Sequence, residues 1–125
     1  MTRKPPTTIL LVDDDPMIRL LGRELLEHLG YRVTALTSSV AALEIFQTRP
    51  ESFDLVITDL TMPQMTGLDL SREILRLRPD LPVILTTGFS EQVTPEIAKE
   101  LGIREYLMKP VVLRQLSQVI RRALG

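Results

Sequence analysis

Short runs of apolar residues alternate along this chain with longer stretches in which apolar residues recur at helical spacing. A short continuous run is typical of a strand buried on both faces, and the longer pattern is typical of an amphipathic helix. The expected strands cover residues 9–12, 32–36, 55–58, 83–86 and 105–108. The expected helices cover residues 16–29, 40–48, 67–77, 95–101 and 112–124. This alternation predicts an α/β fold, with a parallel sheet, right-handed crossovers and helices on both faces.

Individual residues support the helix boundaries. Asp15 can cap a helix that has Pro16 in its first turn, and Gly30 can adopt the left-handed conformation that ends it. In the last helix an apolar stripe should pack on the sheet, and it consists of Leu113, Leu116, Val119, Ile120 and Ala123. The opposite side of that helix is polar and carries Arg114, Gln118 and Arg121.

The length of 125 residues suits one domain, which we expect to cover residues 9–125 after an N-terminal extension of residues 1–8. The net charge of −1 provides no general attraction for nucleic acid. Without cysteine the chain can form neither a disulfide nor a thiolate metal site, which fits a reducing compartment. No apolar run has the length of a signal peptide or a membrane span. We therefore expect a cytoplasmic protein that binds neither membranes nor nucleic acid.

Polar residues of a restricted kind follow the expected strands, at the sheet edge where open parallel sheets bind ligands. They are Asp13, Asp14 and Asp15, then Asp59, then Thr86 and Thr87, and finally Lys109. Carboxylates brought to one edge would repel each other by about 4 kcal/mol per pair, at roughly 4 Å and an effective dielectric constant of about 20. Mg²⁺ with oxygen ligands can offset this repulsion, and a lysine adds a further positive charge. An aspartate in such a setting can act as a nucleophile toward phosphorus.

Four motifs together resemble those of response-regulator receiver domains from two-component signalling. They are Val12-Asp13-Asp14-Asp15, the segment from Thr58 to Gly67, Thr86-Thr87-Gly88, and Lys109-Pro110. They occur in the order and at the spacing of that family, and the similarity covers essentially the whole chain. The resemblance implies a doubly wound, flavodoxin-like sheet of five parallel strands in the order 2-1-3-4-5, with five helices.

The resemblance also implies the chemistry of the site. Asp59 would accept a phosphoryl group from the phosphohistidine of a partner histidine kinase or histidine phosphotransfer protein. Mg²⁺ would be the cofactor, bound directly by Asp14 and Asp59, with Asp13 acting mainly through water. The backbone carbonyl of Thr61 would be the third protein ligand.

Four further residues match the family's catalytic and switch positions. Thr87 matches the hydroxyl residue that moves toward the phosphoryl group, and Lys109 matches the lysine that contacts it. Tyr106 matches the aromatic residue that changes rotamer, and Pro110 would follow a cis peptide bond, which costs little before proline. A downstream partner would then sense phosphorylation at the face formed by the fourth helix, fifth strand and fifth helix. Thr61 and Phe89 match variable positions that influence phosphate lifetime, which therefore stays open.

Each residue also has a simpler interpretation. The aspartates at 13–15 can serve as a helix cap, Asp59 as a turn residue, and Tyr106 as a strand residue. His28 has no assigned role. Among whole-chain alternatives, a haloacid-dehalogenase-like phosphatase would need a second aspartate two residues after the nucleophile, where Thr61 stands. A degenerate receiver would lack Asp59 or Lys109.

We therefore expect a signalling switch that catalyses only its own phosphorylation and dephosphorylation. The segments 57–63 and 86–90 most resemble receivers attached to hybrid sensor kinases, although a stand-alone receiver fits as well.

Overall fold

The computed structural model describes residues 7–88, 94–109 and 113–125, so Phe89 and the expected cis bond before Pro110 lie outside the described residues. The elements alternate as predicted: β1 (Thr8–Val12), α1 (Pro16–His28), β2 (Arg32–Leu36), α2 (Ser39–Thr48), η1 (Pro50–Ser52), β3 (Leu55–Asp59), α3 (Gly67–Leu77), β4 (Val83–Thr87), α4 (Pro95–Glu100), β5 (Glu105–Met108) and α5 (Leu113–Leu124). Within these ranges no helix has both the length and the apolar character needed to cross a membrane.

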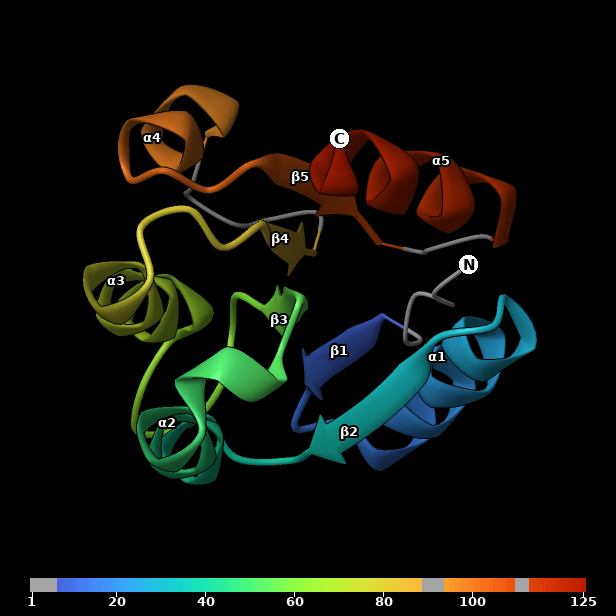
Figure 1. Cartoon of the computed structure of the whole chain (residues 1–125), viewed down its shortest axis with the longest axis horizontal. Helices are drawn as coiled ribbons and strands as arrows, with labels where there is room; N and C mark the ends of the chain where they lie inside the picture. The colour runs from blue at the N-terminus through green and yellow to red at the C-terminus, as the bar shows by residue number, and fades with distance from the viewer. Residues whose placement is uncertain (1–6, 89–93, 110–112) are drawn as a thin grey trace, which may run out of the picture.

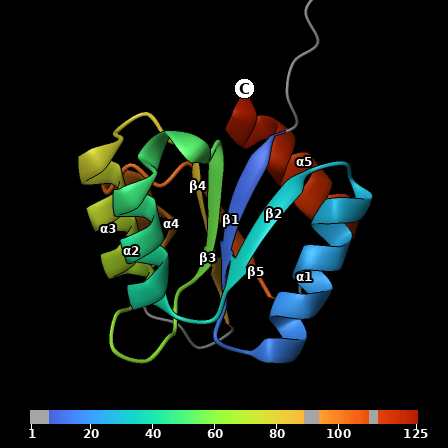
Figure 2. The same ribbon diagram turned by 60° about the horizontal axis from the view of Figure 1, so that its bottom comes forward.

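The strands form one parallel sheet in the order β2-β1-β3-β4-β5, which confirms the predicted fold. Figures 1 and 2 show three layers, with α1 and α5 on one face of the sheet and α2, α3 and α4 on the other. The central strand β3 pairs with β1 and β4. The carboxyl ends of these three strands therefore lie side by side, which is where the polar residues were expected to meet.

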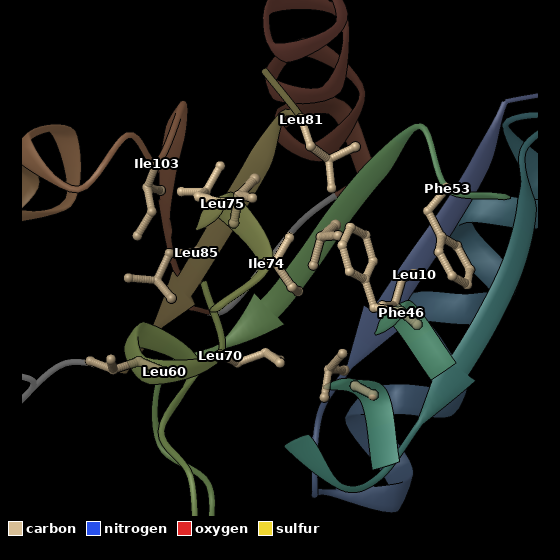
Figure 3. Packing of buried hydrophobic residues seen from close by; sticks show 14 of the residues in the cluster. Leu10, Phe46, Phe53, Leu60, Leu70, Ile74, Leu75, Leu81, Leu85 and Ile103 are labelled. Atoms are coloured by element: carbon tan, nitrogen blue, oxygen red, sulfur yellow. The ribbon is translucent and has the colours of Figure 1, made fainter. Parts of the chain in front are cut away.

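A separate hydrophobic cluster lies between each face of the sheet and the helices on that face, because successive side chains of a strand point to opposite faces. Along β1, Leu10 and Val12 join the cluster under α2 and α3, whereas Ile9 and Leu11 join the cluster under α1 and α5. The first cluster is shown in Figure 3, where Phe46 of α2 lies beside Phe53. Their ring centroids are 6.1 Å apart. Full burial of one such side chain stabilises the fold by about 1.5 to 3 kcal/mol.

The structure confirms the predicted cap at Asp15, the left-handed Gly30 and most of the apolar stripe of α5. The Asp15 carboxylate accepts hydrogen bonds from the backbone N–H groups of Met17 and Ile18, at 2.9 and 3.3 Å. Gly30 has a φ of +97°, the left-handed conformation expected after α1. In α5 the buried stripe consists of Leu116, Val119, Ile120 and Ala123, while the Leu113 side chain lies outside the described residues.

The boundaries differ from the predictions by one residue at several places. Thr8 belongs to β1 rather than to the N-terminal extension, because it lies opposite Arg32 and its N–H donates to the Asp54 carboxylate at 2.8 Å. The strands β3 and β4 extend to Asp59 and Thr87, since backbone pairing continues past the last apolar residue. The short η1 turn was not predicted.

Candidate functional site

The acidic edge begins where β1 ends, at Asp13 and Asp14. Asp13 is 4% exposed, and its Oδ1 accepts a hydrogen bond from the backbone N–H of Asp15 at 3.0 Å. Asp15 itself faces the first turn of α1, where it caps the helix. The cap thus fixes the backbone that orients Asp13, while Asp14 remains exposed beside it.

Asp59 ends the central strand β3 and is 6% exposed. It lies opposite Thr86 of β4, and its neighbour Thr58 lies opposite Val12 of β1. The Thr58 hydroxyl donates to the Asp59 carbonyl at 3.0 Å. The strand that carries the acceptor candidate is therefore paired on both sides as far as Thr58, and its pairing with β4 continues to Asp59 itself.

Lys109 closes the site from the end of β5. Its Nζ lies 2.8 Å from Asp59 Oδ1 and 3.3 Å from Asp13 Oδ2. The Lys109 backbone N–H donates to the Thr87 carbonyl at 2.8 Å, which fixes the origin of this long side chain. Because both carboxylates are largely buried, these charge-assisted contacts are screened much less than a surface salt bridge.

The carboxylates of Asp13, Asp14 and Asp59 each offer an oxygen within 4.8 Å of the others. All the donors are hard carboxylate oxygens, the ligand type that Mg²⁺ prefers over thiolate or imidazole. Lys109 is the ammonium that faces this group within the part of the chain that the structure describes. The carboxylates therefore outnumber the cation, and the cluster can accept a further positive charge.

The pKa of Asp59 reflects first its burial and then the charges around it. Burial raises this pKa above its usual range, and the nearby Asp13 and Asp14 raise it further, against the lowering effect of Lys109. Burial alone would lower the pKa of Lys109, but its hydrogen bond to Asp59 and the attraction of both carboxylates raise it overall. The ammonium thus stays charged at neutral pH, while the Asp59 carboxylate is incompletely compensated.

Thr87 lies apart from this cluster in the structure. Its side chain is fully buried, and its Oγ1 lies 3.1 Å from the Tyr106 hydroxyl and 3.3 Å from the Gly88 carbonyl. The Tyr106 ring packs against the buried cluster under α2 and α3. The two predicted switch residues therefore contact each other across β4 and β5, and Thr87 follows Thr86, the residue of β4 that lies opposite Asp59.

The loop of residues 60–66 leads from Asp59 to α3 and carries Thr61, whose side chain is exposed. The Gly67 N–H donates to the Leu60 carbonyl at 2.8 Å and closes this loop. A Cβ at position 67 would lie only 2.0 Å from the Asp59 carbonyl oxygen. Glycine at 67 thus permits the first turn of α3 to pack directly on the backbone of the candidate acceptor.

Sequence reasoning missed an apolar surface next to the site. Along α1, Met17, Leu20 and Leu21 are each at least half exposed. A cavity of about 430 Å³ opens between α1 and the sheet, and its lining includes Leu21 together with Asp13 and Lys109. The leucine-rich pattern of the helix was visible in the sequence, but nothing in that pattern showed how little of it the sheet would cover.

Comparison with known proteins identifies the class to which this fold and site belong. The family model described as "response regulator receiver domain" matches residues 9–121. The chain therefore belongs to the response regulator receiver domain family, whose members act as signalling switches in two-component systems.

Similar proteins include the transcriptional regulator NtrC of Bradyrhizobium, 39% identical over 97% of this chain and 25% of its own length. The sensor kinase CckA of Brucella abortus is 33% identical over 94% of this chain and 12% of its own length. The chain thus spans about a quarter or less of these curated relatives.

Solved structures agree with this assignment. A receiver domain protein of Clostridium thermocellum has a TM-score of 0.89 and 38% identity, with 94% of each chain covered. The response regulator TrrA of Thermotoga maritima has a TM-score of 0.84 and 31% identity, with 94% of this chain and 99% of that chain covered. The TrrA structure is described as a complex with Mg²⁺ and BeF.

Proposed function

We propose that this chain accepts a phosphoryl group on Asp59 from a phosphohistidine donor, in a reaction that requires Mg²⁺. The observation that carries the proposal is the position of the Asp59 carboxylate, which faces the Lys109 ammonium and lies within reach of two further carboxylates. In the transfer, an Asp59 oxygen forms a bond to phosphorus while the P–N bond of the donor breaks. The donor imidazole keeps the electron pair of that bond, and an acyl phosphate remains on Asp59.

The residues present fit a Mg²⁺ ion, since three carboxylate oxygens converge without any sulfur or imidazole donor. Asp14 and Asp59 would bind it directly, and the Thr61 carbonyl would be a third protein ligand. Both oxygens of Asp13 already have partners, the Asp15 N–H and Lys109, which supports a role for Asp13 through water. When bound, the ion would neutralise the charge that builds up on the phosphoryl oxygens. TrrA, described with Mg²⁺, offers a structural precedent.

Lys109 would stabilise the same oxygens from the opposite side. Its ammonium already contacts Asp59 Oδ1 at 2.8 Å and needs only a small movement to reach an oxygen of an attached phosphoryl group. A preorganised cation costs little reorganisation when charge develops, which is the main source of electrostatic catalysis. The domain would in this way promote its own phosphorylation and dephosphorylation without turning over an external substrate.

The switch would be an exchange of partners at Thr87. Its hydroxyl is now close to Tyr106, at 3.1 Å, and a phosphoryl group on Asp59 would offer strongly charged acceptor oxygens instead. We expect the Thr87→Ala variant to accept phosphate, but with little change in NMR chemical shifts around Tyr106. The same perturbation at Tyr106 in the phosphorylated parent and in the variant would exclude this route.

Two different surfaces would serve the two kinds of partner. The exposed apolar residues of α1 adjoin the acidic edge and would contact the phosphohistidine donor, since large exposed apolar patches mark interaction sites. The face of α4, β5 and α5 includes Tyr106 and would contact the downstream partner.

The chain would be the receiver of a hybrid kinase, which its similarity to the sensor kinase CckA supports. It would work in the cytoplasm, a reducing compartment that suits a chain without cysteine.

The test is an intact-mass measurement after incubation with a small acyl-phosphate donor, with and without Mg²⁺. The parent should gain one phosphoryl group that hydroxylamine removes, and only when Mg²⁺ is present. Asp59→Asn should gain none, because the amide replaces the nucleophilic oxygen. A hydroxylamine-labile phosphoryl group on the Asn variant would place the acceptor elsewhere.

A further inference from the structure

The loop of residues 60–66 is fixed to the core at its first half. Leu60 and Met62 are 7% and 6% exposed and their side chains lie in the buried cluster, whereas Thr61 between them is exposed. The Gly67 N–H bond to the Leu60 carbonyl closes the loop at its base. The second half of the loop needs a separate anchor, because it turns through Pro63 and Gln64, which are exposed.

That turn is strained. Gln64 has a φ of +72° and is the non-glycine residue with positive φ within the described ranges. The Met65 N–H donates to the Pro63 carbonyl at 2.8 Å, so the turn spans three residues. This combination corresponds to the rare form of the γ-turn, and such a conformation costs about 1 to 3 kcal/mol. It persists only where the surrounding structure holds it in place.

Ser39, in the first turn of α2, anchors this turn through a side-chain hydrogen bond. Its side chain is 1% exposed, and its Oγ donates to the Met65 carbonyl at 2.7 Å, across 26 positions of sequence. Its own helix does not need this hydroxyl, because Ser38 is the residue that caps α2, accepting from the Ala41 N–H at 3.2 Å. The bond therefore joins the first turn of α2 directly to the residue after the strained position.

We propose that Ser39 is a positioning residue for the metal-binding loop, holding the turn so that the Thr61 carbonyl is already placed when Mg²⁺ arrives. The proposal rests on the proposed function, since it assumes that Thr61 is a ligand. Without the bond the strained turn can relax, and binding must then order the loop again. Residues that do not touch a metal but fix the orientation of its ligands increase the affinity for that metal.

The test is a titration of the chain with MgCl₂, followed by two-dimensional NMR, for the parent, Ser39→Ala and Ser71→Ala. Ser71 is a matched control, because its buried hydroxyl also donates at 2.7 Å, but to the Gly67 carbonyl of its own helix. We expect Ser39→Ala to raise the Mg²⁺ dissociation constant roughly threefold to tenfold, the effect of one hydrogen bond. Ser71→Ala should stay within about twofold of the parent, as should Ser39→Thr, which keeps the hydroxyl.

Circular dichroism before the titration checks that each variant is folded, and if Ser39→Ala is not, Ser39→Cys takes its place, because a thiol has nearly the size of the hydroxyl but is a much weaker donor. Equal dissociation constants for the parent and the truncated variant would overturn the proposal. So would an equal increase in Ser39→Ala and Ser71→Ala, which would indicate general loosening. A parent that binds no Mg²⁺ at all would instead contradict the proposed function, so the two failures are distinguishable.

Discussion

The helices α1 and α3 occupy equivalent places in the fold but use their apolar residues in different ways. Each follows a strand that has a site aspartate at its end or directly after it, and they contain 13 and 11 residues. In α3 the buried positions are Gly67, Leu70, Ser71, Ile74 and Leu75. In α1 the single buried residue is Leu26, while Leu20 and Leu21 are 50% and 52% exposed. The first helix therefore carries more apolar surface than the sheet covers.

This difference separates a helix that maintains the fold from one that is available to a partner. The aspartates differ only in part in the same sense: Asp59 before α3 is buried, and of the two before α1 Asp13 is buried whereas Asp14 is exposed. The burial of Asp59 suits its proposed role as a fixed, partly desolvated acceptor, and the exposure of Asp14 suits its proposed role as a metal ligand that solvent can reach. Changes on the two sides should therefore have different consequences.

The largest expected effect is on the α3 side. Leu70 is fully buried, so Leu70→Ala should lower the free energy of unfolding by about 3 kcal/mol through lost burial and the cavity left behind. Leu20→Ala on α1 should change it by less than about 0.5 kcal/mol. Urea denaturation of both variants measures the difference, and similar losses would show that α1 is as much a part of the core as α3.

The Leu20→Ala variant also tests the assignment of α1 to the donor. It should be phosphorylated by a small acyl phosphate at the parent's rate but more slowly by a phosphohistidine protein that phosphorylates the parent. Equal rates with the protein donor would remove α1 from the interface.

An intermediate effect is expected at the exposed aspartate. Mg²⁺ at ten times its dissociation constant should stabilise the parent by about 1.4 kcal/mol, because it binds the folded cluster alone. Asp14→Ala should raise the metal-free melting temperature by relieving repulsion, and it should abolish the increase that Mg²⁺ causes. Differential scanning calorimetry with and without Mg²⁺ provides the measurement. An undiminished Mg²⁺ response in the variant would place the metal at other residues.

The smallest effect is expected from the buried aspartate as the pH changes. The pKa of Asp59 is raised in the folded state, so the folded chain binds more protons than the unfolded chain as the pH falls through this pKa. Without metal, the ionised Asp59 should therefore lower the free energy of unfolding above that pKa, and this loss should disappear as the pH falls below it. Urea denaturation at several acidic pH values should show the parent gaining stability relative to Asp59→Asn as the pH falls. If the parent and Asp59→Asn differ in stability by the same amount at every pH, the pKa of Asp59 is not raised by folding.

The sequence predicted most of the architecture because its signals are local. Asp15 before Pro16 marks the start of α1, and the apolar runs mark every strand of the sheet. The meeting of Asp13, Asp59 and Lys109 followed from topology, since parallel strands present their carboxyl ends at one edge.

Features that depend on packing between distant segments could not be predicted. The bond from Ser39 to Met65 joins two elements whose separation no local pattern encodes. The exposure of Leu20 and Leu21 depends on how α1 packs against the rest of the fold. The direct contact of Thr87 with Tyr106 depends on side-chain rotamers that the sequence does not determine.

Because Gly67 lies so close to the backbone of Asp59, no other residue can replace it during evolution without displacing that backbone. A substitution in a side-chain cluster can be compensated by a smaller neighbour, but a Cβ at position 67 would overlap a main-chain oxygen, which has no smaller replacement. Gly30 is different, because its left-handed backbone has open space around it and asparagine can adopt that conformation. In a library of random variants selected for function, position 30 should therefore accept asparagine while position 67 remains glycine.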